Sequence, residues 1–423
     1  MGDKIQVLSV CTSDSYGGAA RAAYRIHCAV RELGIDSYMF VKFKGMKDAN
    51  VLTLEDFIPH NPLYSTYGWM RNKIQNKIQH LVWGKYPNRS NLFMSDLRST
   101  DIHGALRKLD YDILHLHWIN QRFLPLAQLP KDKPIVWTLH DSWPFCGICH
   151  LPMDCQGYQQ TCGCCPALGS DNERDLSFRV WSRKAAIYRK LDLHIVTPSR
   201  WMANCARKSS LFGDLDVRVI PNCIDVDTFY PGDRETACRR LKLDPEKKHI
   251  LFGAMNAVGD KNKGFHYLVR ALDLMGRDLA EEADLVVFGT SHPLDDEIGG
   301  LRVHSLGMLR SVDDIVAAYR AATVTVVPSL SENLSCTIME SMACGTSVTA
   351  FAIGGNEDLI DHRENGYLAG EKDSRDLAEG IRWCIRNRPD LSMQSVRKVL
   401  KHYTPEVVAE EYRDLYLSLN YPL

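Results

Sequence analysis

The stretch TVTVVPSLSENLSCTIMESMACGTSVTAFAI, residues 323–353, is the clearest indication of the fold class. Both of its ends are short runs rich in valine and threonine, which are typical of buried β-strands. Between them we expect a helix that begins near Ser335 and ends at Gly345, because glycine is the usual residue just beyond a helix. A strand, a helix and a second strand in this order predict one unit of a parallel α/β sheet.

The same alternation of apolar runs and amphipathic helical stretches extends along most of the chain. Further runs of β type occupy residues 5–13, 36–43, 112–118, 134–140, 193–199, 217–222, 249–255 and 283–289. Continuous apolar strands between amphipathic helices are typical of parallel sheets that are covered on both faces. Two such series, each long enough for a sheet of its own, predict an α/β fold with two doubly wound domains.

The length of the chain supports this division, because 423 residues are too many for one ordinary core. We expect an N-terminal domain over residues 1–218, with a cysteine-rich insertion near residues 146–165, and a C-terminal domain over residues 219–403. A last helix over residues 404–423 is expected to have Thr404 as its N-cap. The sequence leaves open whether its apolar face packs back on the N-terminal domain.

Composition and charge restrict the class of partner. The formal net charge is −1 at pH 7, which argues against nucleic acid. The chain has no apolar run of about eighteen residues or more, so we expect no membrane-spanning helix. The first residues, MGDKIQVLSV, lack the features of a secretory signal. We therefore expect a cytoplasmic protein, and a peripheral position on the inner face of the cell membrane stays open.

Two carboxylates, Glu332 and Glu340, follow the expected strand that opens the stretch. In open α/β sheets, ligands bind beyond the carboxyl ends of the strands, and the N-terminus of the next helix favours a phosphate. Carboxylates in this place can accept hydrogen bonds from sugar hydroxyls. Two alternatives stay open. Thr337 and Glu340 are spaced as a capping box, and Glu332 by itself fits a solvated loop acid.

Residues 327–360 resemble the E-x7-E region of retaining glycosyltransferases of family 4. This family has the GT-B fold, with two doubly wound Rossmann-like domains facing a central cleft. SYGGAARAAYRIHCAV (15–30), VIPNCIDVDTFYP (219–231) and KNKGFHYLVRAL (261–272) resemble further motifs of the family, although Cys223 stands where glycine is usual. With WTLHDSWPF (137–145) and a cysteine cluster, the likeness is closest to the branch that acts in colanic-acid, exopolysaccharide and O-antigen synthesis.

The resemblance implies roles for residues of the C-terminal domain. Glu340 would hold the ribose of a nucleotide-sugar donor, and Glu332 would contact the donor sugar near its 3-position. Lys263 would neutralise the diphosphate, which gains negative charge as it leaves. Backbone amides of the next residues would meet the diphosphate or the sugar, namely those of Asn333, Leu334, Ser335, Cys336 and Thr337.

Two glycines of the N-terminal domain, Gly17 and Gly18, would let the backbone of the first loop approach the phosphates, where a Cβ would intrude. One feature of the family is missing. Many members carry arginine six or seven residues before the lysine, and this chain has Asn256 and Ala257 there. Lys261 is a candidate substitute for that cationic contact.

His140 ends the expected strand at 134–140 and, by resemblance, would face the reacting sugar. Asp141 is expected either to orient its imidazole or to cap the next turn. His115 and His117 flank Leu116 on a neighbouring strand. We expect that these two histidines do not form a tight pair, and we rank them second to His140.

The resemblance implies a retaining glycosyltransferase that needs no metal for catalysis. It would move a sugar from a UDP- or GDP-sugar to a saccharide or undecaprenyl-linked acceptor in cell-surface polysaccharide synthesis. Two alternatives stay open: a nucleotide-sugar epimerase or hydrolase on the same fold, and a zinc-stabilised binding protein without catalytic activity. An assay for sugar transfer to an acceptor, compared with donor conversion in the absence of an acceptor, distinguishes the transferase from the epimerase or hydrolase.

Six of the fourteen cysteines fall within residues 146–165. Cys149, Cys155, Cys162 and Cys165 have the spacing C-x5-C-x6-C-x2-C, which is compatible with a tetrahedral structural zinc site. The spare candidates for ligands are Cys146, His150 and Cys164. Buried free thiols and a disulfide are the alternatives.

Residues 57–95 contain no acidic side chain but several basic and aromatic ones. A helical stripe is expected there, formed by Ile74, Ile78, Leu81 and Val82. Aromatic and basic residues around such a stripe favour an anionic membrane surface. The alternative is a core-facing helix with a solvated basic side.

Overall fold

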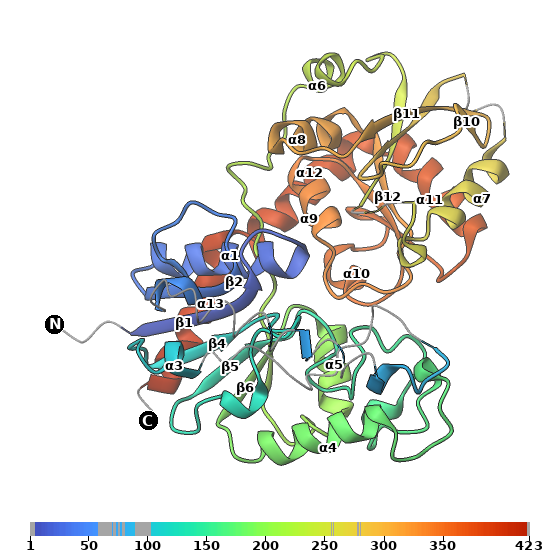
Figure 1. The fold of residues 1–423 in the computed structure, drawn as a ribbon. Coiled ribbons are helices and arrows are strands. Elements are labelled where there is room, and N and C mark those ends of the chain that lie inside the picture. The colour runs from blue at the N-terminus through green and yellow to red at the C-terminus, as the bar shows by residue number, and fades with distance from the viewer. Residues whose placement is uncertain are drawn as a thin grey trace. The chain divides into compact units, whose positions relative to one another are not determined.

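The structure is a computed structural model, and it describes residues 5–57, 70, 73, 74, 77, 81–88, 103–254, 256, 258–276, 279 and 281–420. The chain folds into two compact units, which Figure 1 shows. Unit 1 comprises Met1–Ile220 and Ala409–Leu423, and unit 2 comprises Pro221–Val408. Each unit has its own parallel sheet, so the predicted α/β fold class with two doubly wound sheets is confirmed.

Unit 1 is built on a seven-stranded sheet in the order β3-β2-β1-β4-β5-β6-β7, with every neighbouring pair parallel. The strands are β1 (Gln6–Ser13), β2 (Asp36–Phe43), β3 (Val51–Thr53), β4 (Ile113–Leu116), β5 (Ile135–Thr138), β6 (Leu193–Thr197) and β7 (Val217–Val219). The strand order reverses between β1 and β4. Loops that leave the sheet at such a switch point are where ligands bind in doubly wound folds.

The helices of unit 1 are α1 (Gly18–Glu32), α3 (His103–Leu106), α4 (Leu176–Tyr188), α5 (Arg200–Lys208) and α13 (Pro405–Asn420). The Asp175 carboxylate caps α4 by accepting hydrogen bonds from two backbone N–H groups of its first turn. The last helix, α13, begins in unit 2 and belongs to unit 1 from Ala409 onward. Its buried Tyr412 and Tyr416 hydroxyls bond to Thr138 on β5 and to His115 on β4.

Unit 2 has a second seven-stranded sheet, in the order β10-β11-β9-β8-β12-β13-β14. Its strands are β8 (Lys248–Gly253), β9 (Ala283–Phe288), β10 (Glu297–Ile298), β11 (Leu301–Gly307), β12 (Val324–Val327), β13 (Val348–Phe351) and β14 (Gly366–Ala369). The pairs are parallel except for the short edge strand β10, which is antiparallel to β11. Here the order reverses between β8 and β12, so the loops after these strands flank the switch point.

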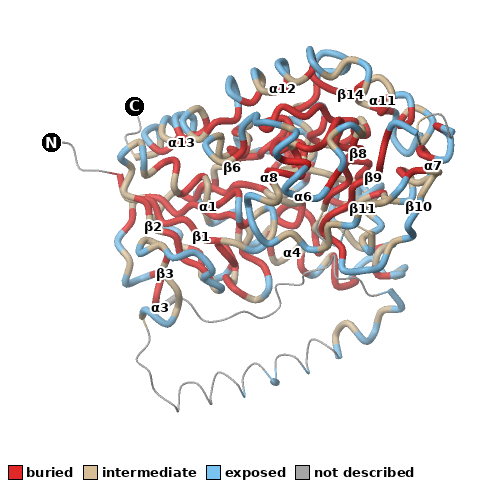
Figure 2. Tube along the Cα trace, turned by 90° about the horizontal axis from the view of Figure 1, so that it is seen from above, coloured by how far each residue is buried: buried red, intermediate tan, exposed pale blue. Residues whose placement is uncertain are grey.

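The helices of unit 2 are α6 (Arg234–Leu241), α7 (Phe265–Met275), α8 (Val312–Ala321), α9 (Cys336–Ala343), α10 (Asn356–Leu359), α11 (Ser374–Arg386) and α12 (Arg388–His402). They help to bury two apolar clusters, and Figure 2 shows the strands as mostly buried.

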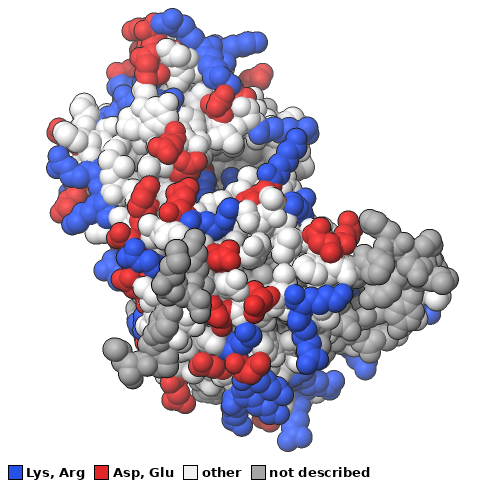
Figure 3. All heavy atoms as spheres, turned by 90° about the vertical axis from the view of Figure 1, so that its left-hand side faces the viewer, with Lys and Arg blue, Asp and Glu red and all other residues white. Residues whose placement is uncertain are grey.

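Basic and acidic side chains are interspersed on the face seen in Figure 3. Within the described residues, no helix combines the length and apolar character that crossing a membrane requires.

Candidate active site

One group of the predicted site residues lies in unit 2, where β12 ends and α9 begins. The expected helix is present as Cys336–Ala343, with Ser335 as its N-cap and Gly345 just beyond it at φ +76°. Ser335 makes no side-chain cap hydrogen bond. Since no N-cap side chain covers the helix start, its first backbone N–H groups can serve an anionic ligand.

The loop after β12 is tied to the turn that carries Lys263. This turn is a short 3-10 helix, Lys261–Lys263, and Gly264 follows it at φ +71°. A Cβ on Gly264 would lie 1.8 Å from the carbonyl oxygen of Pro328, so only glycine lets the two segments come this close. Asn262 adds two hydrogen bonds: its carbonyl accepts from Leu330 N at 2.8 Å, and its side-chain amide donates to the Ser331 carbonyl at 3.1 Å.

These contacts bring Lys263 against Glu332, with 2.7 Å between the ammonium nitrogen and carboxylate Oε1. The Glu332 carboxylate is the main reason that the pKa of Lys263 is raised, against the opposing effect of burial. The lysine is therefore a stable cation at neutral pH. Gly354 helps to fix the backbone of Glu332, because a Cβ there would lie 1.9 Å from the Glu332 carbonyl oxygen.

Glu340 lies on α9 and is only 5% exposed. Its Oε2 accepts a hydrogen bond of 3.0 Å from the hydroxyl of Tyr319 on α8. Burial, and then the Glu340 charge, hold the pKa of this tyrosine well above its ordinary value. The capping-box alternative is wrong, because Ser335 rather than Thr337 is the N-cap and the third helical residue is therefore Ile338.

The other predicted site residues lie in unit 1. Gly17 is the N-cap of α1 at φ +94°, a conformation that side chains other than glycine rarely adopt, and Gly18 is the first residue of the helix. The buried Asp14 holds this loop by accepting hydrogen bonds from the backbone N–H groups of Gly45 at 2.8 Å and Met46 at 3.0 Å.

His140 follows β5 and hydrogen-bonds to His117, with 3.0 Å between His140 Nε2 and His117 Nδ1. Burial lowers the pKa of His140 to about 4 and that of His117 well below its ordinary value. Both rings are therefore neutral near pH 7, and each fixes the tautomer of the other.

The expectation that His115 and His117 form no tight pair is wrong, since their ring centroids lie 4.1 Å apart. Residues two apart on a strand share one face.

Asp141 does not orient the imidazole of His140, because its carboxylate is engaged elsewhere. Its carboxylate accepts a hydrogen bond of 2.7 Å from the Trp118 indole and one of 2.9 Å from Trp143 N, and it pairs closely with the His150 ring. Although burial opposes it, these contacts together lower the pKa of Asp141. Asp141 therefore organises the loop after β5. Sequence reasoning missed His117, Trp118 and His150 as neighbours, and only the i, i+2 spacing in HLHW hinted at the first.

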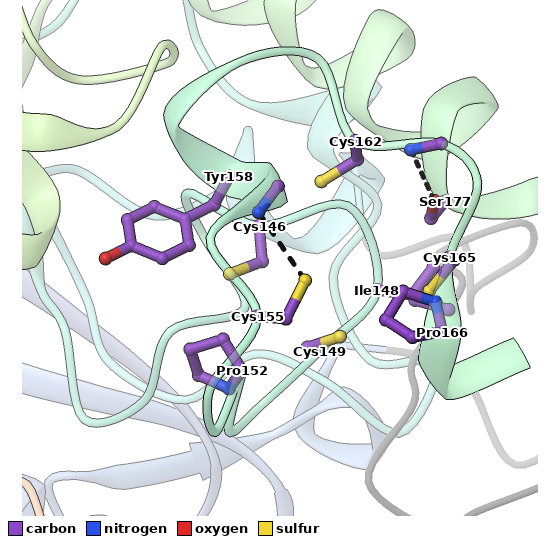
Figure 4. Close-up of a pocket in the computed structure, with 12 residues that line it drawn as sticks. Cys146, Ile148, Cys149, Pro152, Cys155, Tyr158, Cys162, Cys165, Pro166 and Ser177 are labelled. Atoms are coloured by element: carbon purple, nitrogen blue, oxygen red, sulfur yellow. Dashed lines mark hydrogen bonds between the residues drawn. The ribbon is translucent and has the colours of Figure 1, made fainter. Parts of the chain in front are cut away.

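The predicted zinc ligands are close in space but are not arranged around a metal. With Cys146 they line a small cavity of about 20 Å³, which Figure 4 shows. All fourteen cysteines are free thiols. Among the described residues, no three His, Cys, Asp or Glu side chains form a group that could hold a metal ion as they stand.

Ala257, before the lysine motif, lies outside the described residues, as do most of residues 57–95. In the predicted membrane stripe, Ile78 alone lies outside them. Of its described members, Ile74 is 60% and Leu81 is 64% exposed. Val82 instead packs against the cluster around Leu168, which also holds Cys165.

The chain belongs to glycosyltransferase family 4. The family model for Glycosyltransferase Family 4 matches residues 16–228, and the one for Glycosyl transferases group 1 matches residues 246–387. The D-inositol 3-phosphate glycosyltransferase of Corynebacterium aurimucosum is 27% identical over 299 residues, which cover 67% of this chain and 65% of the relative. That of Corynebacterium jeikeium is 30% identical over 178 residues, 39% of this chain and 42% of the relative. The chain spans less than two thirds of the length of these relatives.

Solved structures show the same fold at low identity. A glycosyltransferase of Rickettsia africae superposes with a TM-score of 0.66 at 14% identity, covering 100% of both chains. Sucrose-phosphate synthase of Thermosynechococcus elongatus gives 0.64 at 19% identity, covering 98% of this chain and 99% of that one. HepE of Anabaena in complex with UDP gives 0.64 at 17% identity, covering 98% and 100%. The two seven-stranded sheets therefore have the GT-B architecture.

Proposed function

We propose that this protein is a retaining glycosyltransferase that moves a sugar from a UDP- or GDP-sugar to a saccharide acceptor. The observation that carries the proposal is the Lys263–Glu332 pair at the switch point of unit 2, beside the start of α9. A cation and a helix N-terminus in one place suit a diphosphate, and a carboxylate beside them suits the hydroxyls of the attached sugar.

Each of the site residues of unit 2 has a role in the proposed reaction. Lys263 turns from Glu332 to the diphosphate and stabilises the charge that develops on the leaving group. Glu332 is then available to accept from hydroxyls of the donor sugar. Glu340 accepts from the ribose hydroxyls, while Tyr319 holds one of its oxygens in place. The acceptor hydroxyl forms the new glycosidic bond, the bond to the diphosphate breaks, and the hydroxyl proton passes to a leaving phosphate oxygen.

In unit 1 the neutral His140 is proposed to hydrogen-bond the reacting sugar. Because burial lowers its pKa to about 4, it acts as a dipole rather than as a cation. Membership of family 4 and the likeness to D-inositol 3-phosphate glycosyltransferases support transfer of a sugar over epimerisation.

The proposal extends to a lipid-linked acceptor in cell-surface polysaccharide synthesis, with docking on an anionic membrane. It is supported by the described part of residues 57–95, where the large apolar side chains of Met70, Ile74 and Leu81 are exposed next to exposed Lys73 and Lys77. Such a mixture suits the headgroup level of a bilayer.

A panel of nucleotide-sugars tests the proposal. A donor that binds the folded protein raises its melting temperature, and the donor selected in this way is then incubated with and without saccharide acceptors. We expect an acceptor-dependent product whose anomeric configuration, read by NMR, is that of the donor. Conversion of the donor at the same rate without any acceptor would instead identify an epimerase or a hydrolase.

A further inference from the structure

The cysteine-rich insertion forms a built pocket rather than a loose loop. Five cysteines line its cavity, and Figure 4 shows them around one space. They are Cys146, Cys149, Cys155, Cys162 and Cys165. The volume of about 20 Å³ admits one atom-sized occupant, since a water needs roughly 10–15 Å³.

Four of these five sulfurs have a hydrogen-bond partner, and they are the four that the spacing singles out. Gly147 N donates to Cys162 Sγ at 3.3 Å, and Gly157 N donates to Cys155 Sγ at 3.5 Å. Cys165 receives backbone hydrogen bonds from the residues that follow it, and the Cys149 thiol donates to it. These hydrogen bonds hold the sulfurs in place at the wall of the cavity.

The backbone between the last two of these cysteines is held in an unusual conformation. Cys162, Gly163 and Cys164 have φ values of +51°, +106° and +41°. Cys162 and Cys164 are not glycines, so a positive φ strains them, and it persists only where the surroundings hold it. The turn places Cys162 and Cys165 at the cavity, while Cys164 is exposed.

We propose that this pocket binds one Zn²⁺ ion through Cys149, Cys155, Cys162 and Cys165. Four thiolates form a closed, tetrahedral structural site for zinc. In the structure, the sulfurs of these four cysteines are not grouped closely enough to hold the ion. Binding therefore requires rotation of the cysteine side chains between staggered χ1 positions, which draws the sulfurs into the cavity.

The metal would also position the loop that follows His140. His150 comes directly after Cys149, its ring pairs with the Asp141 carboxylate, and its carbonyl accepts from Ser142 N at 3.0 Å. Zinc bound at Cys149 thus limits the movement of His150 and, through it, of Asp141. On the other side of the insertion, the buried Lys184 of α4 donates to the carbonyls of Cys146 at 2.8 Å and Gly147 at 3.1 Å.

The test is the zinc content of the full chain, which does not depend on any transferase activity. Protein purified without chelator should contain about one zinc per chain by elemental analysis. Cys155→Ser and Cys162→Ser should each reduce this at least severalfold. Cys164→Ser is the matched control, because this cysteine lies in the same turn but outside the cavity, and it should retain the zinc of the parent.

A second measurement uses the parent protein, so it does not depend on whether the variants fold. Replacing zinc by Co²⁺ in the parent protein should give the intense near-ultraviolet absorption of thiolate–cobalt bonds. Three results would overturn the proposal: parent protein with no zinc and fourteen titratable thiols after unfolding, a disulfide between any two of the four cysteines, or equal loss of zinc in Cys164→Ser and Cys155→Ser.

Discussion

The ammonium of Lys263 lies 2.7 Å from the carboxylate of Glu332, although 69 residues separate them in the chain. The side chains are 26% and 16% exposed, so water reaches the pair and a ligand can too. In the proposed function, a diphosphate that enters here would compete with Glu332 for a cation that is already in place. Donor binding would then release Glu332 toward the donor sugar.

Lys263→Ala should lower kcat/KM for the donor by about tenfold to a hundredfold, the value of one charge-assisted hydrogen bond of ~1.5–3 kcal/mol. Steady-state kinetics with varied donor check this. Lys398→Ala is the matched control, because it removes another 2.7 Å ion pair of unit 2, with Asp361, away from the switch-point loops. Equal losses in the two variants would mean that Lys263 contributes only to folding.

Glu340→Gln should raise the donor KM about tenfold with a smaller change in kcat, because the amide keeps an acceptor for Tyr319 but loses the charge that would hold the ribose. Tyr319→Phe is the comparison. It removes the hydroxyl alone, so we expect a lower melting temperature with a donor KM closer to that of the parent. A donor KM unaffected by Glu340→Gln would remove this residue from the donor site.

Gly264→Ala should abolish donor binding or folding, because its Cβ would lie 1.8 Å from the Pro328 carbonyl oxygen. Gly307→Ala is the control. Its φ of +63° is close to the +71° of Gly264, but nothing lies within 4 Å of the added Cβ. The control therefore has the conformational cost of a positive φ, about 1–2 kcal/mol, without the clash. Melting temperature and donor KM distinguish the two, and similar values for both variants would show that the close approach does not matter.

Stability should fall as the pH is lowered from about 6.5 toward 4. Burial lowers the pKa of His140 to about 4, that of His115 to about 3 and that of His117 well below the ordinary 6.5. In this range the unfolded chain binds protons that the folded chain does not, so stability rises with pH. Three such histidines give a slope of up to about 4 kcal/mol per pH unit.

Denaturant unfolding at a series of pH values checks this dependence. His117→Gln should make the curve shallower by about one proton, or ~1.4 kcal/mol per pH unit, because glutamine does not titrate. An unchanged slope would show that His117 titrates normally in the folded protein.

Liposome co-sedimentation tests the proposed membrane docking. Binding should require anionic lipid and weaken with salt, since each basic residue near such a surface contributes about 1 kcal/mol. Replacing Lys73, Lys77 and Lys85 together by Gln should reduce it strongly. A matched triple variant of exposed lysines in unit 2 should bind as the parent does, and it consists of Lys242→Gln, Lys372→Gln and Lys401→Gln. Equal binding by both triple variants would argue against docking through this segment.

The fold could be predicted from sequence patterns that are local in the chain. The strand, helix and strand of residues 323–353 appear as β12, α9 and β13, because burial on both faces of a parallel strand leaves a continuous apolar run in the sequence. The turn glycines Gly17, Gly264 and Gly345 could also be predicted from the sequence, since glycine adopts a positive φ most readily and all three have one.

The contacts of the site residues could not be predicted from the sequence, because they depend on how distant segments pack. Lys263 meets Glu332, and His117 meets His140, only because the sheet order sets separate loops or neighbouring strands side by side. Likewise, the packing of α8 against α9 places Tyr319 on Glu340, whereas the capping box that the local spacing suggested is absent because the helix begins after Ser335. Spacing along the chain determines which face a residue takes, whereas the side chain opposite it depends on how distant elements pack.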